Sequence, residues 1–134
     1  MSPPLRTLDA RFEGCAGHRS LGGGWRPALP PRGQAVFFPA FGDERNHTRR
    51  MVKLAAEALA ARGIESVVFD PHGTGDSSAG FEEATVARWL ADCRAIVARV
   101  QAEAPSRPLL LIGCRLGVAL AAETSRTLPE PAAA

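Results

Sequence analysis

The chain of 134 residues is long enough for one domain and no more. Its hydrophobic content of 46% and charged content of 22% are near the averages of soluble globular proteins. A net charge of +2 is too small to indicate a nucleic acid or an anionic membrane as partner, and neither is expected.

No apolar run approaches the roughly 18 residues needed to cross a bilayer, and the N-terminus lacks the apolar core of a signal peptide. We therefore expect a cytoplasmic protein without a membrane span. The cysteines and histidines are widely scattered, which indicates neither a disulfide framework nor a metal site. They are Cys15, Cys93, Cys114, His18, His47 and His72. No cofactor is predicted.

Residues 1–34 are rich in Gly, Pro and Arg and show no sustained periodicity, so we expect an irregular segment with at most a short hairpin around Arg6–Phe12. The apolar run Ala35–Phe38 then predicts a buried strand. A helix is expected over 43–62, with its end at Gly63. Its predicted apolar face consists of Met51, Leu54, Ala55, Ala58 and Leu59.

Residues 64–70 predict a second strand and 71–80 a glycine-rich loop. A second helix is expected to begin near Glu82 and Glu83 and to end before Pro105. Its predicted apolar face consists of Val86, Leu90, Cys93, Val97 and Val100. Residues 108–112 predict a third strand, 118–124 a third helix and 125–134 a frayed tail.

This alternation of strands and helices predicts a parallel sheet of the α/β class, in which helices cover both faces. The nearly continuous apolar strands agree with it, because parallel strands are buried on both sides.

One motif lies directly between the third strand and the third helix: Gly113-Cys114-Arg115-Leu116-Gly117. That position is typical of the G-x-S-x-G nucleophile elbow, whose glycines permit a tight, strained turn. Arg115 stands here in the place of the serine.

Two loops upstream strengthen the comparison. Residues 39–42, Pro-Ala-Phe-Gly, follow the first parallel strand, and residues 70–78 are similar to a D-x-x-G-x-G-x-S turn. Together with the 113–117 motif they resemble the α/β-hydrolases. The resemblance implies that the backbone N–H groups of Phe41 and Leu116 form an oxyanion hole.

The pattern is most similar to the exosortase A system-associated hydrolases often called hydrolase 2, over roughly residues 34–124. The residues that carry this resemblance are Pro39, Phe41, Glu44, Asn46, Arg49-Arg50-Met51, Gly73-x-Gly75-Asp76-Ser77, Trp89-Leu90-Ala91-Asp92 and Gly113-x-Arg115-Leu116-Gly117. It implies that Arg115 is inherited within that branch, and it implies a setting in protein sorting and exopolysaccharide export. It implies no particular substrate.

The chain also departs from the hydrolase pattern. In that pattern the acid and the histidine follow the serine along the chain. No histidine follows Gly117, and the later carboxylates are only Glu123 and Glu130. We therefore expect a partial hydrolase domain over 35–124 that does not perform Ser-His-Asp chemistry. Its third strand should be an open apolar edge, through which the chain could self-associate.

Arginine cannot attack an acyl group, because its guanidinium stays protonated. On one interpretation Arg115 anchors a carboxylate or phosphate at the mouth of a pocket. On the other it pairs with a carboxylate such as Asp76 or Glu44, or reaches solvent. Cys114 is expected to be inert packing rather than a substitute nucleophile.

His72 and Asp76 are candidate pocket residues on the glycine-rich loop, and a structural role is favoured for His72 over that of a base. Asp70 and Asp76 could each be acids in a site, but such carboxylates more often cap turns or the next helix. A dinucleotide-binding fold is disfavoured, because Gly73-Thr74-Gly75 lacks a third glycine at the required spacing.

Two hypotheses of function follow. In the first, the chain is part of a hydrolase-family enzyme or accessory factor of the exosortase system. In the second, it is a non-catalytic protein that binds a small anionic or acyl ligand through Arg115.

Overall fold

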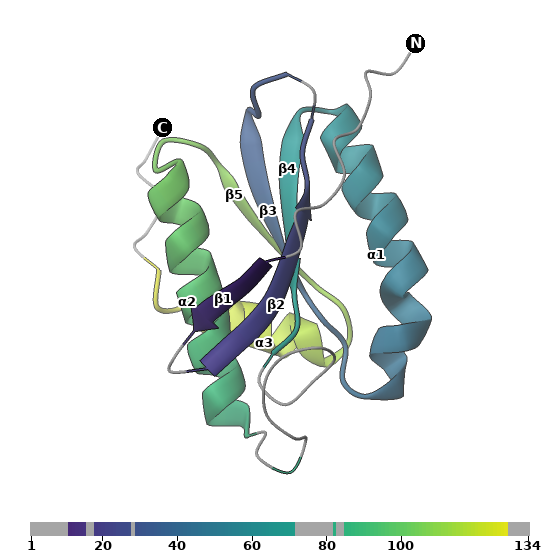
Figure 1. Ribbon diagram of the computed structural model, residues 1–134, viewed down its shortest axis with the longest axis vertical. Helices are drawn as coiled ribbons and strands as arrows, with labels where there is room; N and C mark the ends of the chain where they lie inside the picture. The colour runs from purple at the N-terminus through teal and green to yellow at the C-terminus, as the bar shows by residue number, and fades with distance from the viewer. Residues whose placement is uncertain (1–10, 16–17, 28, 72–81, 83–84, 129–134) are drawn as a thin grey trace.

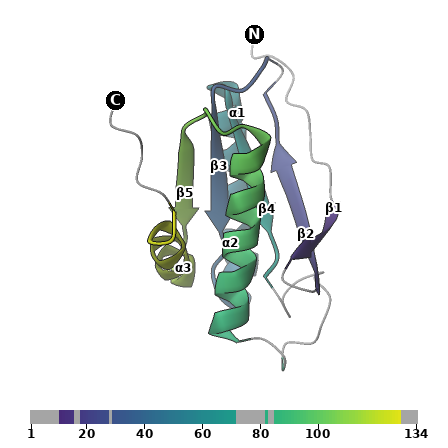
Figure 2. The same cartoon turned by 90° about the vertical axis from the view of Figure 1, so that its left-hand side faces the viewer.

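The computed structural model describes residues 11–15, 18–27, 29–71, 82 and 85–128, with the backbone alone for 11–15 and 18–23. Its strands form one mixed sheet in the order β1-β2-β4-β3-β5, which Figure 2 shows edge to edge. The strands are β1 (Arg11–Cys15), β2 (His18–Trp25), β3 (Gly33–Phe38), β4 (Ile64–Phe69) and β5 (Leu109–Gly113).

The centre of the sheet is parallel, as the sequence predicts. β3 lies between β4 and β5 and runs parallel to both, with Phe38 opposite Gly113 at one end. Every residue of β3 is buried. Because the three strands are parallel, their carboxyl ends meet at the same edge of the sheet, and the loops that follow them are neighbours.

The N-terminal part differs from the expectation of an irregular segment. β1 and β2 form an antiparallel hairpin, and β2 continues the sheet antiparallel to β4. The hairpin overlaps the predicted Arg6–Phe12 only at Arg11 and Phe12, and residues 6–10 are outside the described part. Gly24 permits the pairing, because a Cβ there would lie 2.6 Å from the backbone oxygen of Ser66.

Three helices cover the described part of the sheet: α1 (Asp43–Ala61), α2 (Val86–Glu103) and α3 (Leu116–Ser125). Figure 1 shows α1 on one side of the sheet and α2 and α3 on the other. This is the three-layer arrangement predicted for the α/β class.

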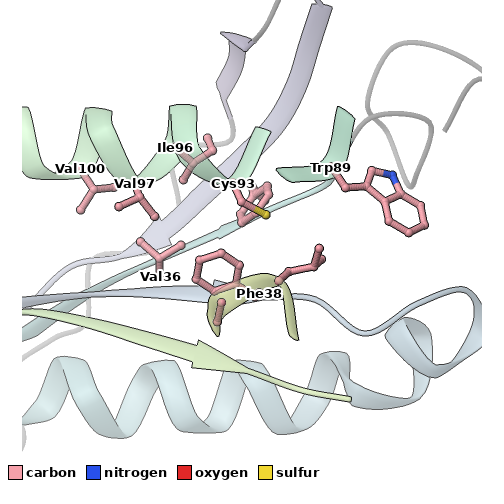
Figure 3. Packing of buried hydrophobic residues seen from close by; sticks show 10 residues of the cluster. Val36, Phe38, Trp89, Cys93, Ile96, Val97 and Val100 are labelled. Atoms are coloured by element: carbon pink, nitrogen blue, oxygen red, sulfur yellow. The ribbon is translucent and has the colours of Figure 1, made fainter. Parts of the chain in front are cut away.

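The main core lies between the sheet and α2. Figure 3 shows α2 above β3, with Val97, Val100 and Cys93 turned toward Val36 and Phe38. The ring of Phe38 meets that of Phe69 edge to face, with centroids 6.0 Å apart. α3 adds Leu120 and Ala121 to this cluster. The α2 residues of the cluster are Trp89, Cys93, Ile96, Val97 and Val100.

The predicted apolar face of α1 is wrong. Ala56 and Ala60 are the buried residues of this helix, and they let its backbone approach β4 closely. Met51 and Leu54, by contrast, are more than half exposed. Both stripes have helical spacing, and periodicity could not separate them because the apolar residues extend around most of the helix.

The start of α2 differs from the prediction. α2 begins at Val86, later than Glu82 and Glu83, because the side chain of Thr85 caps it. Val86 is exposed, whereas Cys93, Val97 and Val100 are buried as predicted.

β5 is an edge strand that pairs only with β3 in the described part of the chain, as expected. Self-association through this edge remains a prediction.

Candidate functional site

The turn at residues 113–117 joins β5 to α3 and holds Arg115 in an unusual conformation. Arg115 has φ 56° and ψ −120° and is the N-cap residue of α3. It is the one non-glycine residue with positive φ among the residues that the structure describes. L-residues avoid this region, and where one is held in it, the surroundings must over-determine the backbone.

The two glycines on either side of Arg115 allow the backbone to pack tightly enough to hold this conformation. A Cβ at Gly113 would lie 2.4 Å from the backbone N of Val118, and one at Gly117 would lie 2.1 Å from the backbone O of Phe38. Neither position therefore accepts a side chain. The Cys114 N–H also donates to the Phe38 carbonyl at 3.3 Å, which ties the turn to the end of β3.

The loop after β3, residues 39–42, ends in a similar way. Gly42 has φ 57° and is the N-cap residue of α1, with no side-chain cap. Asp43 and Glu44 then supply the negative charge in the first turn of the helix, where it is favoured by the helix dipole. The starts of α1 and α3 thus both lie at the carboxyl edge of the parallel strands.

An ion pair joins these two starts. The Arg115 Nη2 and Nε both donate to Oε1 of Glu44, at 2.7 and 3.2 Å. Of the alternatives left open by the sequence, pairing with Glu44 is therefore the one observed. The hydrogen bond from Arg115 lowers the pKa of Glu44 below its usual value, and the same bond raises the pKa of Arg115.

The loop after β3 and the start of α3 contribute to a shallow apolar hollow, whose empty space of about 250 Å³ includes open solvent. Phe41 and Leu116, the two residues predicted to form an oxyanion hole, both line it. The rings of Phe41 and Trp89 are in contact, with centroids 5.5 Å apart. The remaining lining residues are Pro39, Ala40, Pro71 and Leu120.

The sequence did not single out Trp89 or Leu120 as site residues. Trp89 is in the first turn of α2 and Leu120 in the second turn of α3, and both are also core residues. Helical spacing predicts burial for such residues, but it carries no signal that they border a hollow.

Asp70 is not in the hollow. It is buried at the end of β4 and forms an ion pair with Arg45 of α1. This ion pair links the end of the strand to α1, and the role of Asp70 in capping a turn or a helix stays a prediction. His72 and Asp76, the candidate pocket residues, lie outside the described residues.

Cys93 and Cys114 are free thiols, Cys93 buried and Cys114 partly buried. Burial raises the pKa of the Cys93 thiol from 9.0 to about 12. Within the described ranges, no three His, Cys, Asp or Glu residues are grouped as a metal site requires. In the same ranges no helix has both the length and the apolar character to cross a membrane.

The strand order and the helices on both faces are those of an α/β-hydrolase, and solved structures agree. The protein Est1E from Butyrivibrio proteoclasticus, with ferulic acid bound, matches 87% of this chain at 24% identity and a TM-score of 0.73. An α/β serine hydrolase homologue from Coxiella burnetii matches 90% at 17% identity and 0.72. The epoxide hydrolase VrEH1 from Vigna radiata matches 90% at 16% identity and 0.68.

The family described as serine aminopeptidase, S33 (Hydrolase_4) matches residues 30–134. The chain belongs to this family of α/β-hydrolases. It spans 48%, 58% and 36% of the three structures above, in the same order. No curated protein matches the sequence significantly.

Proposed function

We propose that the hollow is an acyl-ligand site of the α/β-hydrolase type, in which Arg115 occupies the nucleophile-elbow position and holds the ligand by charge. The observation that carries this proposal is the backbone of Arg115. A residue with φ 56° between a parallel strand and a helix is presented at the carboxyl edge of the sheet, as the nucleophile of an α/β-hydrolase is.

The placement of Phe41 and Leu116 supports the same proposal. Both line the hollow, and the loops that contain them are those from which α/β-hydrolases draw their oxyanion-hole amides. Leu116 is the first residue of α3, so its N–H has no acceptor within the helix. In this proposal the two amides receive the carbonyl or carboxylate oxygen of the ligand.

Arg115 determines what the site does with that ligand. A guanidinium has no lone pair available for attack at any pH at which the protein is folded. It is, however, a strong partner for carboxylate and phosphate groups. The chain is therefore proposed to bind an anionic acyl ligand and not to cleave it by a Ser-His-Asp mechanism.

Binding is tested by titrating ¹⁵N-labelled protein with octanoate and recording the amide spectrum. We expect saturable shifts at Phe41 and Leu116, with Glu123, on the far part of α3, as the reference. Octan-1-ol, which has the same apolar chain without the charge, should bind more weakly. The proposal fails if octanoate leaves the Phe41 and Leu116 signals unchanged.

Hydrolysis is tested with p-nitrophenyl butyrate on the wild type and on Arg115→Ala. We expect neither protein to exceed the buffer rate. Turnover by the wild type that disappears in Arg115→Ala would show that Arg115 takes part in catalysis and would overturn the binding-only assignment.

The proposal also includes the biological system in which the protein works. The residues that resemble the exosortase-associated branch include Glu44 and Arg115, the two members of the ion pair. In this proposal the chain is part of a hydrolase-family protein of the exosortase and exopolysaccharide system, and ester or acyl hydrolysis would be an activity of the whole protein. Intact mass spectrometry of the product captured from its source cells tests whether the chain is part of a longer protein: a mass well above 14.2 kDa supports this, whereas 14.2 kDa assigns the function to this chain alone.

A further inference from the structure

In the Arg115–Glu44 pair, the guanidinium of Arg115 binds a carboxylate, and that carboxylate is the side chain of Glu44. Two N–H groups of the guanidinium, from Nε and Nη2, converge on the single oxygen Oε1 of Glu44. The partners are 71 residues apart in sequence, with Glu44 in the first turn of α1 and Arg115 at the N-cap position of α3. Glu44 therefore shows where a carboxylate fits against Arg115.

The pair is also open to exchange. The Arg115 side chain is 67% exposed and the Glu44 side chain 46% exposed. Exposed ion pairs contribute little to stability, because water and salt compete for both partners. An external carboxylate can therefore replace Glu44 at a small cost in free energy.

The residues of the ion pair are close in sequence to two residues that line the apolar hollow. Arg115 directly precedes Leu116, and Glu44 is three residues after Phe41. Leu116 and Phe41 both line the apolar hollow. A ligand with a carboxylate on Arg115 can thus extend a short apolar part toward the hollow.

We propose that Glu44 is an internal competitor that occupies the carboxylate position of the ligand, and that a monocarboxylate with a short apolar tail displaces it from Arg115. This inference rests on the proposed acyl-ligand site and names its ligand class and its regulation. Arg115 alternates between Glu44 and the ligand, so the affinity of the site is set by both.

The test measures octanoate affinity by calorimetry for the wild type, Glu44→Gln and Arg115→Gln. Glutamine keeps the size of Glu44 but removes its charge. Because the competing ion pair is exposed and therefore weak, Glu44→Gln should tighten octanoate binding only about two- to fivefold. Arg115→Gln should weaken it, and Glu44→Gln should bring no further gain in the Arg115→Gln background.

Glu123→Gln is the matched control, since Glu123 forms an exposed ion pair with Arg126 elsewhere on α3. It should leave octanoate affinity unchanged. Octan-1-ol should bind the wild type and Glu44→Gln equally, because the alcohol does not compete with Glu44.

The outcomes separate this inference from the proposed function. Arg115-dependent octanoate binding with no gain in Glu44→Gln overturns the competitor role and leaves the acyl-ligand site standing. Absence of octanoate binding to all variants overturns both. If octyl phosphate binds the wild type more tightly than octanoate, the assignment to monocarboxylates is wrong.

Discussion

At the scale of single residues, Arg115 combines backbone strain with a charge at the carboxyl edge of the sheet. Its φ of 56° is enforced by two glycines whose neighbours leave no room for a Cβ. The spacing of those glycines in the sequence indicated the turn. It could not decide whether Arg115 would meet Glu44, Asp76 or solvent, because that choice depends on how loops distant in sequence are brought together.

The strain at Arg115 leads to a stability prediction. Glycine adopts positive φ without a steric penalty, whereas alanine does not. We expect Arg115→Gly to be about 1 kcal/mol more stable than Arg115→Ala in urea denaturation. Arg126, with φ −65°, is the control position, where the glycine variant should not be the more stable one. Equal stability of the two Arg115 variants would show that the turn relaxes when the arginine is removed.

At the scale of elements, the helices begin in two different ways. α1 and α3 follow residues with positive φ and lack a side-chain cap. α2 instead begins after Thr85, whose hydroxyl accepts from the Arg88 N–H at 3.1 Å. The sequence placed the start of α2 too early, because acidic residues near a helix start and a threonine cap are competing signals of similar strength.

Removal of this cap should destabilise the protein. We expect Thr85→Ala to lower the free energy of unfolding by about 1 kcal/mol, since the Arg88 N–H loses its acceptor. Thr85→Ser retains the hydroxyl and should remain close to the wild type. Chemical denaturation monitored by circular dichroism measures both, and an equal loss in the two variants would argue against the capping role.

At the scale of the whole molecule, the core between the sheet and the α2–α3 side contains an ionisable thiol. Burial raises the pKa of Cys93 to about 12, while a hydrogen bond with Thr124 opposes the shift. The folded pKa lies above the usual value of 9.0. The resulting stabilisation is therefore complete below about pH 9 and is lost as the pH rises toward 12.

Stability measured from pH 8 to 11 should reflect this. The wild type should lose stability above pH 9, by up to about 1.4 kcal/mol per pH unit, relative to Cys93→Ala. The chain has no tyrosine, and Lys53 is its only lysine, so few other groups titrate in this window. Cys114→Ala is the control and should keep the alkaline loss. Parallel pH profiles for the wild type and Cys93→Ala would contradict the prediction.

The edge strand β5 gives the last prediction. Its residues are Leu-Leu-Leu-Ile-Gly, without a charge to discourage pairing, and Leu110 is 45% exposed. Such edges promote association unless they are covered. Sedimentation velocity should show concentration-dependent association of the wild type and less of it for Leu110→Lys. A monomer at all concentrations would remove this expectation.

The sequence by itself determined the α/β class, the parallel strands β3, β4 and β5, and the turn that contains Arg115. These follow from local patterns: continuous apolar runs, helical spacing and glycines at fixed separation. Only the tertiary structure decided that the N-terminal hairpin extends the sheet, that Ala56 and Ala60 face it, and that Glu44 holds Arg115. The physical reason is that strand neighbours, buried helix faces and ion pairs between distant residues depend on packing of the whole chain, which local periodicity does not specify.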